Sequence, residues 1–119
     1  MSELLTPSQA EQTEENRLRA HVQHIVNSIE NGFPDELGQD DEPFNAFDYL
    51  QDALDIEYIV SGKKEYLGAR VLVAFGGPNI WINTRTKQVE GYWWGDRCIL
   101  SYDTDAMDLD GALSELYSC

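Results

Sequence analysis

The sequence predicts a single α+β domain over residues 1–119, in which an antiparallel β-meander of four to five strands packs with N-terminal and C-terminal helices. Three observations support this fold class. A chain of 119 residues is the size of one domain, and a hydrophobic content of 42% is enough for a core. The apolar residues follow a helical period at both ends of the chain and a strand period between residues 56 and 102.

The first helix is predicted to begin at Pro7. Thr6 is expected to be its N-cap, and Gln9 completes a capping box. The helix carries an apolar stripe and ends at Asn31-Gly32, and the stripe consists of Leu18, Val22, Ile25, Val26 and Ile29. Residues 1–16 are expected to fray, since Ala10 is the one apolar residue in 8–16.

An acidic loop is predicted over residues 33–43, where Pro, Gly and five carboxylates leave little to bury. A second helix should follow over residues 43–54. Its apolar face would be formed by Phe44, Phe47, Leu50 and Leu54.

The strand-like segments of the meander are joined by short turns and span residues 57–60, 69–75, 80–83, 88–94 and 97–102. Residues 69–75 are almost wholly apolar, which is typical of a central strand covered on both faces. A final helix is predicted over residues 107–117, with Leu109, Ala112, Leu113, Leu116 and Tyr117 on its apolar side.

The net charge of −14 is distributed unevenly. Residues 1–57 hold 14 acids and two bases, residues 58–102 hold three acids and six bases, and residues 103–119 hold five acids and no base. This balance excludes ordinary binding to nucleic acid or to anionic membranes, because both need basic patches. It favours a basic macromolecular partner, with plain solubility as the alternative explanation.

We expect a cytoplasmic protein. No apolar run approaches the length of a membrane span, and residues 1–7 lack the pattern of a signal peptide. Two cysteines form no disulfide framework, and Cys98 is expected to be a buried thiol.

The sequence predicts no enzymatic activity, no cofactor and no metal site. His21 and His24 have the spacing of two ligands on a helix, but no carboxylate or cysteine at matching spacing joins them. The acids of residues 103–111 fail the pattern of a calcium loop and are expected to cap the final helix. No phosphate-binding loop or nucleophile motif is present.

An aromatic cluster is the first candidate binding feature. Side chains alternate faces along a strand, so Trp93 should point opposite to Tyr92 and Trp94. Helices can cover one face fully, which leaves large aromatic side chains on the other, where they often anchor partners. We therefore predict Trp81, Tyr92 and Trp94 as partner-binding residues, with Arg70, Arg85 or Arg97 near the rings. The alternative is that strand curvature or the first helix covers them.

Acidic side chains are the second candidate feature. On the predicted second helix, Asp48, Asp52 and Asp55 would lie about one turn, or roughly 5–6 Å, apart. Together with Asp40, Asp41 and Glu42 they would form a run of negative charge comparable to successive phosphates. Such a run could occupy a basic groove meant for DNA or RNA. The alternative is a solvated helix face beside an acidic loop.

One stretch carries a resemblance: residues 66–83, YLGARVLVAFGGPNIWIN, with residues 91–96, GYWWGD. It resembles a motif in small uncharacterised acidic proteins of phages and mobile elements. The likeness covers about residues 50–119 and implies a biological context without any catalytic residue. In size, acidity and lack of active-site motifs the chain is also similar to anti-CRISPR and anti-restriction proteins.

These features lead to three hypotheses. The first is a stoichiometric inhibitor, an anti-CRISPR protein whose acidic surface acts as a DNA mimic against a CRISPR effector or another nuclease. The second is an immunity protein that neutralises a cationic toxin. The third is a housekeeping domain that binds a small ligand in an aromatic pocket. A homo-oligomer is compatible with all three.

Overall fold

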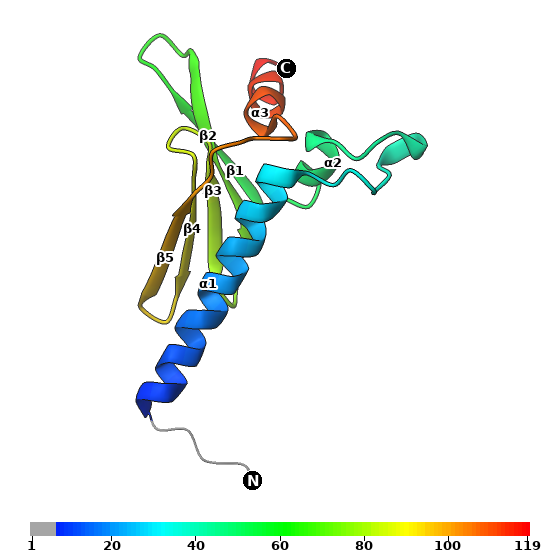
Figure 1. The fold of residues 1–119 in the computed structure, drawn as a ribbon. Helices are drawn as coiled ribbons and strands as arrows, with labels where there is room; N and C mark the ends of the chain where they lie inside the picture. The colour runs from blue at the N-terminus through cyan, green and yellow to red at the C-terminus, as the bar shows by residue number, and fades with distance from the viewer. Residues whose placement is uncertain (1–6) are drawn as a thin grey trace.

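The computed structural model describes residues 7–119, and side chains from Asn16 onward. Three α-helices, one short 3₁₀ turn and five strands follow one another along the chain (Figure 1). They are α1 (Pro7–Asn31), η1 (Gln39–Asp41), α2 (Ala46–Leu50), β1 (Asp55–Val60), β2 (Tyr66–Ala74), β3 (Asn79–Asn83), β4 (Gln88–Trp93), β5 (Asp96–Ser101) and α3 (Leu109–Ser118).

The five strands form one sheet in the order β1-β2-β3-β4-β5, and each neighbouring pair is antiparallel. The register places Asp55 opposite Leu72, Leu72 opposite Trp81 and Trp81 opposite Glu90. Sequential strands are therefore spatial neighbours, which is the natural result of short turns between them. The predicted α+β fold, a meander with helices at both ends of the chain, is confirmed.

Helix α1 lies across β4 and β5 and buries the predicted apolar stripe. Leu18, Val22, Val26 and Ile29 are buried, and Ile25 is half-buried. The helix ends as expected, because Gly32 has a φ of +66° and its amide donates to the Ser28 carbonyl at 2.8 Å. Thr6 and the side chain of Gln9 lie outside the described residues, so the capping and fraying expected there stay predictions.

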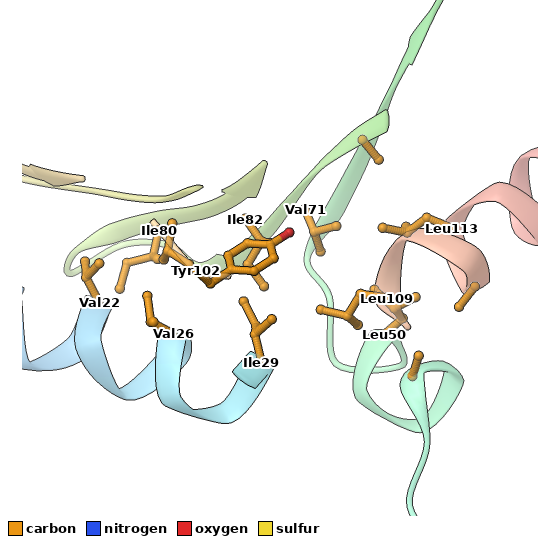
Figure 2. Close-up of a cluster of buried hydrophobic side chains, with 14 of the residues drawn as sticks. Val22, Val26, Ile29, Leu50, Val71, Ile80, Ile82, Tyr102, Leu109 and Leu113 are labelled. Carbon is orange, nitrogen blue, oxygen red and sulfur yellow. The ribbon is translucent and has the colours of Figure 1, made fainter. Parts of the chain in front are cut away.

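The helices that are described pack on one face of the sheet and enclose the core with it (Figure 2). Ile80 of β3 faces Val22 and Val26 of α1, and Leu109 and Leu113 of α3 lie toward Val71 of β2 in the same cluster. Gly91 of β4 allows α1 to come this close: a Cβ there would lie 2.5 Å from Val22 Cγ2. Alternate sheet residues therefore face a helix layer, and the others form a second face.

The second helix is shorter than predicted. Helix α2 spans Ala46–Leu50 instead of residues 43–54, and it buries Ala46 and Leu50. Phe47 and Leu54 are 42% and 60% exposed, so the predicted apolar face is wrong for both. Two local contacts set the limits. Asn45 is the N-cap, and the amide of Leu54 already donates to the Leu72 carbonyl of the sheet at 2.8 Å.

Strand β2 is covered on one face only by the described residues. Ala69 and Val71 are buried under the helices, whereas Arg70 and Leu72 are half-buried on the opposite face. The prediction of a central strand covered on both faces is wrong, because β2 lies second from the edge and the helix layer stays on one side. Cys98, expected to be buried, is also half-buried. None of the described helices has the length and apolar character needed to cross a bilayer.

Candidate functional site

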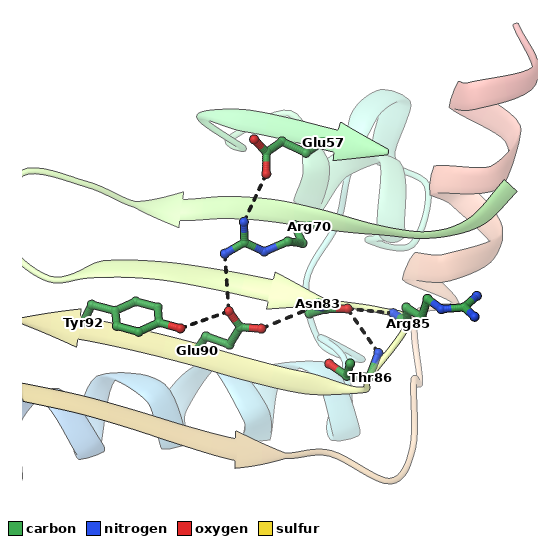
Figure 3. A network of polar contacts seen from close by, with 7 residues as sticks. All are labelled: Glu57, Arg70, Asn83, Arg85, Thr86, Glu90 and Tyr92. Atoms are coloured by element: carbon green, nitrogen blue, oxygen red, sulfur yellow. Dashed lines mark hydrogen bonds and ion pairs between the residues drawn. The ribbon is translucent and has the colours of Figure 1, made fainter. Parts of the chain in front are cut away.

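Two surfaces contain the predicted site residues. The open face is the side of the sheet turned away from α1 and α3, and it carries Arg70, Glu90 and Tyr92 (Figure 3). The register places Trp81, opposite Glu90, on the same face. The acidic end consists of the loop 33–43, α2, α3 and the residues that flank these two helices; α2 contacts α3, and α3 packs on β2 (Figure 1).

On the open face, Arg70 bridges two carboxylates. Its Nη1 lies 3.1 Å from Glu57 Oε1 on β1, and its Nη2 lies 3.3 Å from Glu90 Oε1 on β4. Tyr92 Oη also donates to Glu90 Oε1 at 3.2 Å, and Asn83 Nδ2 donates to Oε2 at 3.5 Å. The Glu90 side chain is only 13% exposed, so these three donors replace the water that it loses. The network holds one cation and two carboxylates, and each carboxylate has an oxygen within 3.3 Å of a guanidinium nitrogen.

Trp81 supports the same network. The guanidinium carbon of Arg70 lies 4.3 Å from the centre of the Trp81 ring, which confirms the expected arginine contact. Tyr92 is 36% exposed on this face, while Trp93 packs against the core, as strand alternation predicted. Partial burial and the charge of Glu90 raise the pKa of the Tyr92 phenol, so it acts as a neutral donor to that carboxylate.

Trp94 is 81% exposed and lies in the β4–β5 turn, outside the strand. Strand alternation therefore does not place it beside Tyr92. It has a φ of +52° and is followed by Gly95 at +81°, the pattern of a two-residue hairpin turn. A hollow of about 330 Å³ beside it is lined by Tyr92, Asn79 and Arg97, among others.

The acidic loop is folded back on itself. The Gly38 amide donates to the Glu42 carbonyl at 2.7 Å, and Leu37 pairs with Pro43. Asp40 and Asp41 have φ values of +57° and +60°, a conformation that aspartate and asparagine tolerate better than most residues. Asp40, Asp41 and Glu42 are all exposed on this loop.

Asp48 holds the loop and α2 together. Its carboxylate accepts from the Asn45 amide at 2.9 Å and from the Gln39 amide at 3.4 Å. Asn45 Oδ1 in turn accepts from the Asp48 amide, which completes a capping box. The carboxylate also packs so closely on Gly38 that any side chain there would collide with it. Asp48 has a structural role, which the spacing Asn45-x-x-Asp48 could have indicated.

The predicted row of Asp48, Asp52 and Asp55 on one helix is wrong, because α2 ends at Leu50. Asp52 is exposed in the turn that follows α2. Asp55 begins β1, and its register with Leu72 and Trp81 places it on the open face. The β4–β5 turn, which contains Trp94, lies at the end of the sheet far from α2 and α3 (Figure 1). The structure thus does not gather the predicted residues into one site.

The acids before α3 cap that helix, as predicted. Asp105 accepts from the amides of Leu109 and Asp110 at 2.8 and 3.1 Å, and Asp108 accepts from the Gly111 amide at 3.1 Å. Tyr66 Oη donates to Asp110 Oδ1 at 2.7 Å and ties α3 to β2. These hydrogen bonds come from neutral donors, so the carboxylates keep their net charge.

No carboxylate of the acidic end forms an ion pair with a described residue, since both ion pairs among the described residues belong to Arg70 on the open face. The sequence explains this difference: no lysine or arginine occurs between Arg19 and Lys63 or after Arg97. The exposed carboxylates of the acidic end are Asp35, Glu36, Asp40, Asp41, Glu42, Asp52, Asp108, Asp110 and Glu115. This end therefore presents uncompensated negative charge.

Sequence reasoning missed the Arg70–Glu90 network and an exposed Phe47 between α2 and α3. Alternation along β2 and β4 puts Arg70 and Glu90 on one face, which was a usable signal. No comparable signal predicts that Phe47 is exposed, because its helical spacing from Leu50 favours burial. In the described part of the chain, no group of three or more His, Cys, Asp or Glu side chains has the arrangement of a metal site.

Comparison with known proteins adds no relationship: no family model, no curated protein and no solved structure matches this chain.

Proposed function

We propose that this protein is a stoichiometric inhibitor that binds a basic, nucleic-acid-binding defence complex through its acidic end, in the manner of an anti-CRISPR protein. The observation that supports this proposal is the uncompensated charge of the loop 33–43, α2 and α3. A cationic nucleic-acid channel would supply the missing counter-charges, and long-range attraction would speed the encounter.

The open face is a weaker candidate than the acidic end for binding a basic partner. Arg70 already satisfies Glu57 and Glu90 there, and Trp81 is engaged by the same guanidinium. A partner would have to break these contacts before it gained new ones. At the acidic end, Asp41 and Asp52 are exposed, and no hydrogen bond or ion pair to either side chain is formed within the described residues.

The test is a titration of the protein into a panel of purified CRISPR effector complexes and cationic nuclease toxins, with DNA cleavage and binding measured at low and high salt. The informative variant is Asp41→Asn with Asp52→Asn, since asparagine keeps the left-handed backbone at position 41. Asp48 is unsuitable because its carboxylate holds the loop to α2. The matched control is Glu65→Gln with Asp96→Asn, which removes two negative charges elsewhere.

We expect inhibition that saturates at one molecule per complex, weakens with salt and is reduced about tenfold by the Asp41/Asp52 variant. The control variant should inhibit like the wild type. Inhibition of a toxin instead of an effector would assign the protein to the immunity class, which uses the same electrostatics. The proposal is wrong if no basic nuclease is bound at low salt, or if both variants behave alike.

A further inference from the structure

An apolar groove crosses the acidic end between α2 and α3. It consists of two adjoining hollows of about 320 and 450 Å³, which share Phe47 and Glu115 as lining residues. Leu50 of α2 and Leu109 of α3 belong to the same buried core cluster, so the two helices form a fixed base beneath it (Figure 2). Small residues, Ala46, Gly111 and Ala112, line the first hollow.

Apolar side chains stay exposed along this groove. Phe47 is 42% exposed on α2, and Leu116 is 37% exposed on α3. Met107 completes the lining of the first hollow and is half-buried. Exposed aromatic and aliphatic side chains in a concave surface are the usual anchors of a protein interface.

Carboxylates border the same groove. Asp108 and Glu115 are exposed lining residues, and neither forms an ion pair with any described residue. No lysine or arginine occurs in α2 or α3, or in residues 20–62. Lys64 contacts α3 through its backbone, since its carbonyl accepts from Tyr117 Oη at 2.8 Å. An apolar stripe bordered by negative charge is complementary to a helix with an apolar stripe bordered by positive charge.

We infer that the α2–α3 groove is the docking site for an amphipathic helix of the partner whose polar face is rich in lysine and arginine. Helix α3 has ten residues and is about 15 Å long, which matches about ten residues of a bound helix. The apolar face of that helix would cover Phe47 and Leu116, and its basic residues would meet Asp108 and Glu115. This inference rests on the proposed function, because it names the segment by which the basic partner is held.

The probe is a synthetic helical peptide of leucine and lysine with the leucines at i, i+3, i+4 and i+7. Two reference peptides replace its leucines by serine or its lysines by glutamate. Binding is followed by fluorescence anisotropy and by amide chemical shifts of the labelled protein. The variants are Phe47→Ala and Leu116→Ala, and the matched control is Phe75→Ala. Phe75 is 72% exposed, lies in the β2–β3 turn and lines neither hollow.

We expect the leucine–lysine peptide to bind with shifts concentrated in α2 and α3, and both groove variants to weaken it about tenfold. Phe75→Ala should change the affinity less than about twofold. Equal binding of the serine peptide would overturn the inference, since charge alone would then suffice. An unchanged peptide affinity in both groove variants would also overturn it, as would an equal loss of affinity in Phe75→Ala.

The same variants separate this inference from the proposed function. If the peptide occupies the groove but no nuclease on the panel is inhibited, the groove stands and the inhibitor proposal fails. If a nuclease is inhibited and Phe47→Ala and Leu116→Ala inhibit it equally well, the inhibitor proposal stands and the groove inference fails. Circular dichroism at the working temperature checks that each variant is folded.

Discussion

The open face and the acidic end both carry several carboxylates, but they use them differently. On the open face, one arginine, one tyrosine and one asparagine surround Glu90, and the network that also includes Glu57 joins four strands. At the acidic end, carboxylates either accept from neutral donors or point into solvent. The first arrangement stabilises the fold, whereas the second leaves negative charge to interact with another molecule.

This difference shows that the number of acids in a region is a poor guide to its role. Asp48 and Asp52 are four residues apart and equally acidic in sequence. Asp48 is half-buried in a capping box, and Asp52 is exposed in the next turn. Only the second kind of carboxylate is available to a basic partner without loss of stability.

The largest expected effect comes from breaking the open-face network. Arg70→Met keeps an apolar side chain over Trp81 but leaves Glu90 without a cation. The Glu90 side chain is only 13% exposed, so water cannot fully replace the lost partner. We expect the free energy of unfolding to fall by about 1–3 kcal/mol, measured by urea denaturation at neutral pH. Arg85→Met, at an exposed position without an ion pair to any described residue, is the control and should change it by less than about 0.5 kcal/mol. Equal losses in both variants would contradict the role assigned to Glu90.

A smaller effect is expected where the sheet meets the acidic end. Tyr66→Phe removes the hydrogen bond to Asp110, and we expect it to lower the free energy of unfolding by about 0.5–1.5 kcal/mol. Burial and the hydrogen bond to Asp110 raise the pKa of the Tyr66 phenol above its usual value of 10.0. The folded state therefore favours the neutral phenol, and this stabilisation is full below pH 10 and is lost as the pH rises further. The wild type should lose stability more steeply than Tyr66→Phe above about pH 10; parallel curves would contradict the assignment.

The smallest effect on stability should come from the exposed carboxylates. Asp41→Asn with Asp52→Asn relieves repulsion, so we expect a gain of less than about 0.5 kcal/mol at low salt that disappears at about 0.5 M NaCl. Asp48→Ala serves as the contrast, because loss of the capping box should cost about 1 kcal/mol at either salt concentration. A large loss in the Asp41/Asp52 variant would show that these carboxylates are structural, and the comparison between the two regions would fail.

The sequence by itself determined the elements of this protein. The helical spacing from Leu18 to Ile29, the change of period after residue 55 and the turns at residues 61–64 and 84–87 predicted α1, the meander and its topology. These signals are local, because they depend on residues a few positions apart. Local signals did not predict where α2 ends, since the chain enters the sheet when the Leu54 amide donates to the Leu72 carbonyl of β2.

The tertiary structure alone decided which charges are free. Arg70 on β2 reaches Glu57 on the neighbouring strand β1 and Glu90 on β4, across β3. Tyr66 meets Asp110 from 44 residues away. Asp48 is satisfied by the amide of Gln39 as well as by its own helix. Whether a carboxylate is ion-paired, hydrogen-bonded or exposed depends on the groups that the folded chain brings near it. The sequence therefore predicted an acidic protein, and the fold left exposed carboxylates at the acidic end, where Asp108 and Glu115 line the groove between α2 and α3.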